Sequence, residues 1–378
     1  MKDVLIKKWQ WHFSAFLVSL GIVLALVLCS PLISKALLDP SSEQFSKKYS
    51  TFISHPYYPV FQSDNNEALH VLRYTLESGD VALFGSSELS SDKSRFTPYL
   101  FLSQNLKLKL KAFGHAGCQN KAIITEILSV YSSDILEHGR IVILLSPTWF
   151  LNGEGINESL WRKEIATPVI LSRIRENKMI EPSVKDEILG KEKSPFFMNE
   201  IDKLARIIID QKFLHSNSSM IKEKEVLSVD IKWEEFKNEA KQFEKNLTTN
   251  SFAINDEYYG KYIKPIMGTP KFPLSVAPVI EIDQNKEIKD FELLLRILSK
   301  FKNPPLFVIL PLSQKAYKDT EMLNPTLKYV ESKIHEDGYP LLNLWSRPFE
   351  AGVLTDVMHV GAYGWTMIDE FIYKNSLR

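Results

Sequence analysis

The sequence predicts an α/β fold built on a mostly parallel sheet. Three short runs that are apolar except for Arg140, at 81–84, 140–145 and 306–310, are typical of strands in such sheets, because those strands are covered on both faces. Stretches with apolar residues at helical spacing alternate with these runs, as in βαβ units. With 378 residues, 44% of them hydrophobic and 24% charged, the chain is long enough for one large α/β domain or two small ones.

The first 38 residues are predicted to form a membrane anchor. Residues 9–34 contain no Asp, Glu, Lys or Arg, and their apolar centre at 13–33 has about the 20 residues that a membrane helix needs. Lys7 and Lys8 precede the span, so the N-terminus is expected on the cytoplasmic side and the rest of the chain outside. The alternatives are a cleaved signal peptide, for which an Ala-x-Ala site is missing, or a buried core helix.

Helices and strands are predicted to alternate in the next part of the chain. Helical spacing of apolar residues predicts helices at 66–78 and 122–136. Leucines alternate with lysines at 106–111, and this period of two predicts a half-exposed strand rather than a short basic helix. The glycine-containing segment 114–119 is typical of a strand-to-helix turn in which the backbone is able to approach a ligand closely.

From 151 to about 302 the pattern is mostly helical, and we interpret this region as a helical insertion in a domain that spans 39–378. Helices are expected at 196–213 and at 233–247, where alternating Lys and Glu are typical of a solvated helix face. The α/β pattern resumes near 305. It is expected to continue with a helix, a short strand and a closing helix, at 324–335, 341–345 and 364–373.

The charge balance and the cysteine content argue against a nucleic-acid-binding surface and against a disulfide or a cysteine-based metal site. Lys plus Arg equals Asp plus Glu at 46 each, which argues against a broad nucleic-acid-binding surface. The two cysteines, Cys29 and Cys118, lie in the predicted anchor and in the predicted soluble domain, so they are not expected to pair. Neither belongs to a cluster with nearby His or Cys of the kind that binds metal, and no metal or cofactor is expected.

A serine nucleophile is predicted at the end of the first strand. The serines Ser86 and Ser87 follow Gly85, at the carboxyl end of a strand, where open α/β sheets place their sites. Gly-Ser-Ser is also an ordinary turn with a helix N-cap. The nucleophile is favoured by Asp356 and His359 near the other terminus, because a carboxylate three residues from an imidazole is able to hold its tautomer.

The motifs at both ends of the chain resemble the DltD family, which belongs to the wider SGNH-hydrolase group. Gly-Ser-Ser-Glu-Leu stands at 85–89, and Asp-x-x-His-x-Gly-x-x-Gly-Trp stands at 356–365. Between them, in order, are Gly-x-x-Gly-x-Gln at 114–119, Ser-Pro-Thr-Trp-Phe at 146–150 and Phe-Ala-Ile-Asn at 252–255. Each motif is weak alone, but their order and spacing are specific, and with the anchor the resemblance covers nearly the whole chain.

The resemblance implies an SGNH-hydrolase-like three-layer sandwich with a parallel sheet, a helical insertion and one N-terminal transmembrane helix. It further implies that Ser87, Asp356 and His359 are catalytic. By the same resemblance Gly117 and Gln119 belong to the oxyanion and substrate-binding site, with the backbone N–H groups of Ser87 and Gly117 as donors to the oxyanion.

The implied function is D-alanylation of teichoic acids in Gram-positive cell envelopes. A membrane-anchored acyltransferase would move D-alanine through a serine ester to lipoteichoic acid, with a membrane-bound acyltransferase and other proteins of the pathway as partners. The alternatives are a D-alanyl thioesterase or esterase, a non-enzymatic scaffold, and an envelope O-acetyltransferase or sugar esterase. The predicted topology favours the transferase over a thioesterase, because an external domain does not easily meet a cytoplasmic carrier protein.

Two positions depart from the wider SGNH group. Residues 146–150 stand where that group carries a Gly-x-Asn-Asp block whose Asn completes the oxyanion hole, and Ser86 stands where it has Asp. The DltD family shares both departures, and the third oxyanion donor stays unassigned. Trp149 and Phe150 are interpreted as core residues, with a pocket wall as the alternative, and Glu88 as a helix cap, with a contact to a substrate ammonium as the alternative.

Overall fold

The computed structural model describes residues 16, 18–20, 57–58, 65–91, 94–106, 108–114, 116–151, 153–190, 231–245, 247–275 and 280–376. The predicted anchor lies almost wholly outside these residues, and the predicted helix at 196–213 lies wholly outside them. Within the described part, no helix has both the length and the apolar character needed to cross a membrane. The elements below belong to the larger of two compact units, Phe52–Lys191 together with Lys224–Arg378.

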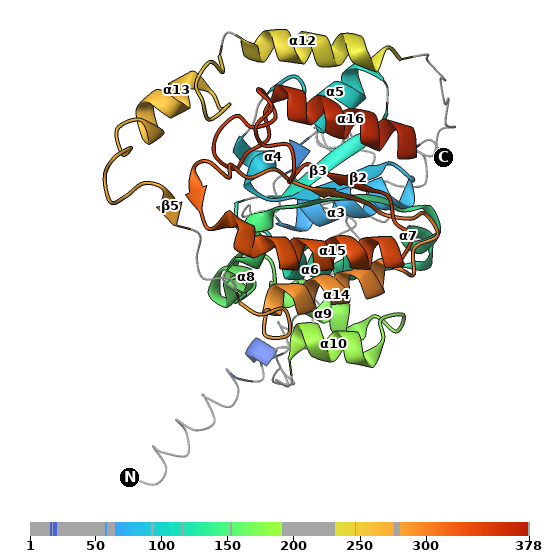
Figure 1. Ribbon diagram of the computed structural model, residues 1–378. Coiled ribbons are helices and arrows are strands. Elements are labelled where there is room, and N and C mark those ends of the chain that lie inside the picture. The colour runs from blue at the N-terminus through green and yellow to red at the C-terminus, as the bar shows by residue number, and fades with distance from the viewer. Residues whose placement is uncertain are drawn as a thin grey trace. The chain divides into compact units, whose positions relative to one another are not determined.

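A six-stranded sheet forms the middle of this unit (Figure 1), and each of its hydrogen-bonded pairs is parallel. The strands, in their spatial order, are β1 (Tyr57–Tyr58), β3 (Leu110–Gly114), β2 (Val81–Gly85), β4 (Arg140–Leu145), β6 (Leu306–Ile309) and β8 (Leu341–Asn343). The chain passes from β2 to β3 on one side and then to β4 on the other, so the strand order reverses at β2. The predicted α/β class with a parallel sheet is confirmed.

Strand β2 explains why the predicted strands are continuously apolar. Val81 and Leu83 belong to the hydrophobic cluster on one face of the sheet, and Ala82 and Phe84 belong to the cluster on the other face. All residues of β2 are buried. Because both faces are covered, the strand has no solvent-facing side on which polar residues would alternate. The three apolar runs predicted as strands are confirmed as β2, β4 and β6.

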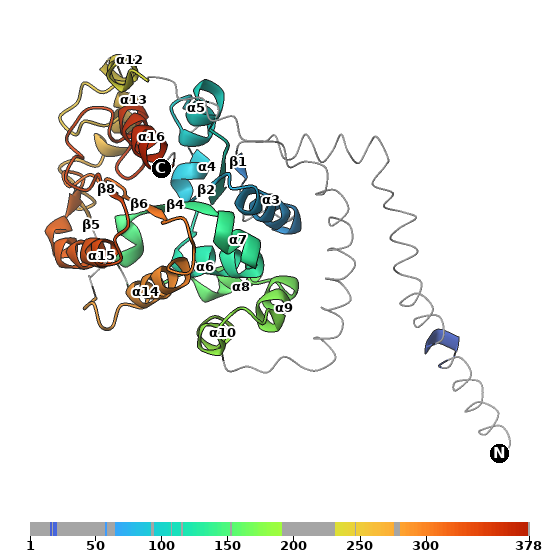
Figure 2. The same ribbon diagram turned by 90° about the vertical axis from the view of Figure 1, so that its right-hand side faces the viewer.

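Helices cover both faces of the sheet and make three layers (Figures 1 and 2). One cluster contains residues of α3 (Asn65–Glu77), α6 (Asn120–Ser129), α14 (Lys286–Leu298) and α15 (Asn324–Glu336). The opposite cluster contains residues of α5 (Pro98–Asn105), α12 (Trp233–Lys245) and α16 (Ala362–Ser376). The structure therefore confirms the predicted helices at 66–78, 233–247, 324–335 and 364–373.

The described residues between 151 and 302 are mainly helical. Besides α12 and α14, this region forms α8 (Glu158–Glu164), α9 (Pro168–Glu176), α10 (Pro182–Leu189) and the short α13 (Asp256–Tyr258) with a π-helical turn at Tyr259–Ile263. Trp161 of α8 and Ile170 of α9 belong to the same core cluster as α6. The proposed limits of the insertion, 151–302, and of the whole domain, 39–378, stay predictions.

The predicted strand at 106–111 is wrong in position and in exposure. Helix α5 runs to Asn105 and is followed by Leu106 as its C-cap, so the strand β3 begins only at Leu110. Because β3 lies between β1 and β2 and is covered on both faces, its residues are buried except Lys111, which is half-buried. Burial lowers the pKa of the Lys111 ammonium to about 8.

The predicted single helix at 122–136 is two helices. Helix α6 ends at Ser129, and α7 (Ser133–His138) begins after a break. At the break Ser132 has an extended backbone, and its hydroxyl accepts a hydrogen bond from the N–H of Ile135 at 3.3 Å. A serine that caps the next helix satisfies a free N–H there and interrupts the preceding helix, which the apolar spacing alone did not reveal.

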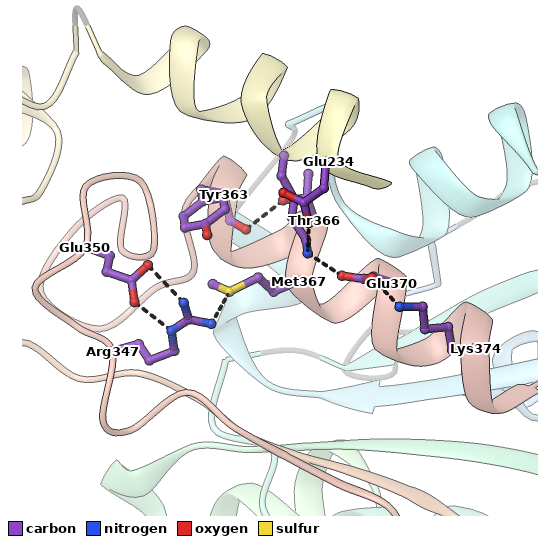
Figure 3. A network of polar contacts seen from close by, with 9 residues as sticks. Glu234, Arg347, Glu350, Tyr363, Thr366, Met367, Glu370 and Lys374 are labelled. Atoms are coloured by element: carbon purple, nitrogen blue, oxygen red, sulfur yellow. Dashed lines mark hydrogen bonds and ion pairs between the residues drawn. The ribbon is translucent and has the colours of Figure 1, made fainter. Parts of the chain in front are cut away.

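Helix α12 is joined to α16 by a partly buried ion-pair network. The ammonium of Lys237 lies 2.9 Å from a carboxylate oxygen of Glu234 and 2.6 Å from one of Glu370, and Glu370 also pairs with Lys374. Figure 3 shows Glu370 of α16 below Glu234 of α12, and Lys374 on the side of Glu370 that faces away from Glu234. The side chains of Lys237 and Glu370 are each 17% exposed, so this pair is better shielded from solvent than the usual surface ion pair.

Replacing Lys237 with methionine is expected to lower the free energy of unfolding by about 1 kcal/mol, because Glu370 then loses its shielded cation while the apolar stem is kept. The measurement is urea unfolding of the purified protein. The matched control is Lys232→Met, which removes an exposed pair with Glu235 and is expected to lower the free energy of unfolding by less than Lys237→Met does. Equal losses in the two variants would contradict a special contribution from the α12–α16 network.

Candidate active site

Three side chains from opposite ends of the chain meet beside the carboxyl end of β2. The imidazole Nε2 of His359 lies 2.9 Å from Oγ of Ser87, and its Nδ1 lies 2.6 Å from Oδ2 of Asp356. The His359 and Asp356 side chains are each 18% exposed, so their hydrogen bond is shielded from bulk water. A hydroxyl, an imidazole and a carboxylate in this order are able to generate a serine nucleophile.

Ser87 stands at the point where the strand order of the sheet reverses. It is the first residue of α4 (Ser87–Ser91), which follows β2 after a bend at Ser86. The carboxyl ends of strands at such a switch point flank the crevice in which open α/β sheets bind ligands. The carboxylate of Glu88 accepts a hydrogen bond from the N–H of Ser86 at 2.6 Å, and burial raises the pKa of Glu88. This contact agrees with the structural role favoured for Glu88.

Asp356 and His359 are held in place by their own loop, between β8 and α16. Oδ1 of Asp356 accepts hydrogen bonds from the N–H groups of Met358 and His359, each at 2.8 Å. The loop then folds closely against itself at Gly361, where a Cβ would come within 2.5 Å of the carbonyl oxygen of Gly352. Gly361, two residues after His359, is therefore needed for the loop to fold this closely.

The environment of Asp356 favours its charged form. Burial disfavours the carboxylate, but the hydrogen bond and charge of His359, with the backbone N–H groups of Met358 and His359, outweigh burial and lower the Asp356 pKa. The side chain is therefore a carboxylate at neutral pH. It is able to hold the imidazole in one tautomer and to stabilise the imidazolium that forms when the histidine takes a proton.

Gly117 and Gln119 lie in the turn after β3, the strand next to β2. Gly117 has a φ of +92°, a conformation that favours glycine, and a Cβ there would come within 3.0 Å of Leu160. Gln119 is the N-cap of α6, and its side-chain oxygen is buried without a hydrogen-bond partner among the described residues. The structure thus places both residues one strand away from Ser87, whereas Ser87, His359 and Asp356 are in direct contact.

The loop after β4 borders β2 on its other side. The hydroxyls of Ser146 and Thr148, two half-buried residues at the start of this loop, are 2.8 Å apart, so they are polar side chains near the position of the missing Asn. The indole of Trp149 and the ring of Phe150 are 4% and 0% exposed and belong to the main core cluster. Their interpretation as core residues is confirmed.

The segment that begins at Phe252 packs against the loop of Asp356 and His359. Phe252 and Ile254 form a small buried cluster with Val357 of that loop. This contact places Phe252, and Tyr258 and Tyr259 that pack against the same cluster, beside the loop of Asp356 and His359.

Two tyrosines lie close enough to Asp356 to respond to its charge. Burial raises the pKa of Tyr258, with a further contribution from Asp356. Burial also raises the pKa of Tyr317 to about 12, with contributions from Tyr258 and Asp356. Both phenols are thus protonated at neutral pH and able to donate hydrogen bonds. Tyr317 lies outside every motif, and no sequence signal pointed to it.

Comparison with family models matches the chain to the family described as DltD protein, over residues 60–192 and 170–375. Protein DltD of Staphylococcus aureus (strain NCTC 8325 / PS 47) is 25% identical over 326 residues, which covers 78% of this chain and 80% of that protein. Protein DltD of Bacillus subtilis (strain 168) is 24% identical over 344 residues and covers 77% and 81%. Protein DltD of Lacticaseibacillus rhamnosus is 24% identical over 331 residues and covers 77% and 76%.

Proposed function

Since this chain belongs to the DltD family, we propose that it is an acyltransferase of teichoic acid D-alanylation. In this proposal the enzyme moves D-alanine through an ester on Ser87 to lipoteichoic acid at the outer face of the membrane. The observation that carries the proposal is the continuous hydrogen-bond chain from Asp356 through His359 to Ser87, with lengths of 2.6 and 2.9 Å. Such a chain supports nucleophilic catalysis because it supplies a base next to the hydroxyl.

In the first half-reaction Oγ of Ser87 attacks the acyl carbonyl while Nε2 of His359 accepts the hydroxyl proton. The N–H groups of Ser87 and Gly117 hold the oxyanion of the tetrahedral intermediate, each donor contributing about 3–4 kcal/mol in the transition state, and Gln119 contacts the substrate. The intermediate then collapses, the bond to the leaving group breaks, and His359 returns the proton to that group. A D-alanyl ester remains on Ser87.

In the second half-reaction a hydroxyl of the polymer gives its proton to His359 and attacks the ester carbonyl. The bond to Oγ breaks, the proton returns to Ser87, and D-alanine is left ester-linked to the polymer. The free ammonium of that ester offsets phosphate charge. Water in place of the polymer hydroxyl would give an esterase or thioesterase from the same intermediate, so the acceptor alone distinguishes these reactions.

The proposed location follows from the predicted anchor. A transmembrane helix within the first 38 residues, with the basic end inside, would hold the domain at the outer membrane surface, where the polymer and a membrane-bound acyltransferase of the pathway are found. The SGNH-hydrolase-like character of the fold is part of the same proposal. A non-enzymatic scaffold is the rival from another class, and it predicts that the serine hydroxyl is dispensable.

Incubation of the full-length protein with a fluorophosphonate, which labels activated serines, tests the proposed nucleophile. We expect a single adduct, mapped by peptide mass spectrometry to Ser87, because this hydroxyl is hydrogen-bonded to Nε2 of His359. The matched variant Ser86→Ala is expected to be labelled like the wild type, and Ser87→Ala is expected to stay unlabelled. Labelling of Ser86 in the Ser87→Ala variant, or none in the wild type, would contradict the assignment.

A further inference from the structure

The first turn of α14 is bonded to the loop after β4. The side-chain amide of Asn285 donates to the carbonyl of Phe150 at 3.0 Å, and the N–H of Lys286 donates to the carbonyl of Gly153 at 2.8 Å. Asn285 is the N-cap of α14, where its side-chain oxygen accepts from the N–H of Glu287 at 3.0 Å. These contacts place the next side chain, Glu287, at a defined position beside the active-site loops.

Glu287 connects α14 to the turn that carries Gly117. Its Oε1 accepts two hydrogen bonds from Asn120, from the backbone N–H at 2.9 Å and from the side-chain Nδ2 at 2.8 Å. Both residues are 0% exposed. Asn120 is the first residue of α6, and the first N–H groups of a helix have no partner within that helix. Glu287 therefore satisfies a buried donor from 167 positions away in the sequence.

The N-cap residue of α6 supplies no side-chain cap to that helix. Gln119 stands at the N-cap position of α6, but its side chain makes no capping hydrogen bond. Gly117 is in a conformation that side chains rarely adopt. Gly117 lies two residues before this N-cap, and the double contact between Asn120 and Glu287 holds the start of α6.

We propose that Glu287 is a positioning residue, which holds the start of α6 so that the Gly117 N–H stays directed at the oxyanion formed on the acyl group of Ser87. The inference rests on the proposed function. Oxyanion donors act only over a narrow range of distances, about 2.7–3.1 Å, so a small displacement of the turn weakens transition-state stabilisation. Substrate binding, which does not need the oxyanion, is affected less.

The environment of Glu287 suggests the variant that restores its role. Burial raises the pKa of Glu287 well above its usual range, and the nearby Asp290 adds to this effect while Lys286 opposes it. The second oxygen of Glu287 is buried without a hydrogen-bond partner among the described residues. Glutamine is uncharged, has nearly the same shape and keeps an oxygen that accepts from Asn120, so Glu287→Gln is expected to preserve the contact.

The test compares rates of Ser87 labelling by a fluorophosphonate in the full-length protein, at equal concentrations of folded material. We expect Glu287→Ala to lower the second-order rate constant about 10- to 100-fold, and Glu287→Gln to stay within about threefold of the wild type. The matched control is Glu126→Ala. Like Glu287, Glu126 is a buried carboxyl whose pKa is raised by burial, to about 8, but it lies within α6 rather than on α14. This control is expected to lower the thermal midpoint and to leave the rate within about twofold.

Any of three results would overturn the inference. The first is a rate constant for Glu287→Ala equal to that of the wild type. The second is a Glu126→Ala variant that is labelled as slowly as Glu287→Ala, and the third is a Glu287→Gln variant that does not keep the wild-type rate. If Glu287→Ala does not fold, Asn120→Ala replaces it, with an expected loss of about threefold to tenfold, and an unchanged rate is then the contradicting result. A wild-type protein that is not labelled at Ser87 would refute the proposed function and this inference together, whereas the three results above leave the proposed function intact.

Discussion

Replacing His359 with alanine is expected to slow acylation of Ser87 about 10⁴-fold or more, because the hydroxyl loses the only base with which it shares a hydrogen bond among the described contacts. The rate constant for fluorophosphonate labelling measures this loss directly. Ester-linked D-alanine in cells is the second readout, and it is expected to fall to background.

The matched control for this variant is His335→Ala. His335 is on α15 and its side chain is 60% exposed, so its removal is expected to change neither readout by more than about twofold. Circular dichroism and the thermal midpoint show whether each variant is folded. Rapid labelling in a folded His359→Ala protein would show that Ser87 is activated by another group or is not the nucleophile.

Replacing Asp356 with asparagine is expected to slow the same reaction about 10³- to 10⁴-fold with little change in structure. The carboxylate accepts a hydrogen bond from the N–H at Nδ1, which keeps the proton of the neutral imidazole on Nδ1 and leaves Nε2 free to act as the base toward Ser87. An asparagine amide in its place is able to donate a hydrogen bond to Nδ1. This contact favours the tautomer of His359 that has its proton on Nε2. In that tautomer Nε2 is unable to accept the proton of the Ser87 hydroxyl. Asp337→Asn, at the exposed end of α15, is the matched control and is expected to keep the wild-type rate.

Asp356 also has a predictable effect on stability as the pH changes. Its pKa is lower in the folded protein than in the unfolded chain, where it is about 3.9. The stabilisation from its charged form is therefore fully present above that value and is lost as the pH falls through the lower pKa of the folded protein. The difference in unfolding free energy between the wild type and Asp356→Asn is therefore expected to shrink as the pH falls below about 4. A difference that grows as the pH falls below this value would contradict this sign.

The parts of the fold that the sequence predicted well are those in which one physical requirement determines the residue types. Strands β2, β4 and β6 are covered on both faces, so their residues are apolar except Arg140, which is half-buried at the start of β4. The predictions of a strand at 106–111 and of a single helix at 122–136 failed, because in each stretch the spacing of apolar residues did not determine the structure alone. The leucine–lysine alternation at 106–111 belongs mainly to a connection, and the cap at Ser132 divides a stretch with uniform helical spacing.

The site was predictable to the extent that short motifs mark it. Ser87, Asp356 and His359 lie in motifs at the two ends of the chain, and the structure brings their side chains into contact. Their catalytic roles stay a prediction, as do those of Gly117 and Gln119. Tyr317 and Glu287 were missed, because their contacts join distant segments and a lone Tyr or Glu gives no local signal of a partner far along the chain.

In the proposed mechanism the Ser87 hydroxyl carries the acyl group, so the amount of ester-linked D-alanine on envelope polymers is expected to depend on that hydroxyl. The measurement uses cells whose only copy of the protein is Ser87→Ala, with the amount of protein and its membrane association checked, and Ser86→Ala as the control. We predict that the ester disappears in Ser87→Ala cells and remains in the control while the protein stays abundant. Near wild-type ester content in Ser87→Ala cells would show that the hydroxyl is dispensable and that the protein acts as a scaffold.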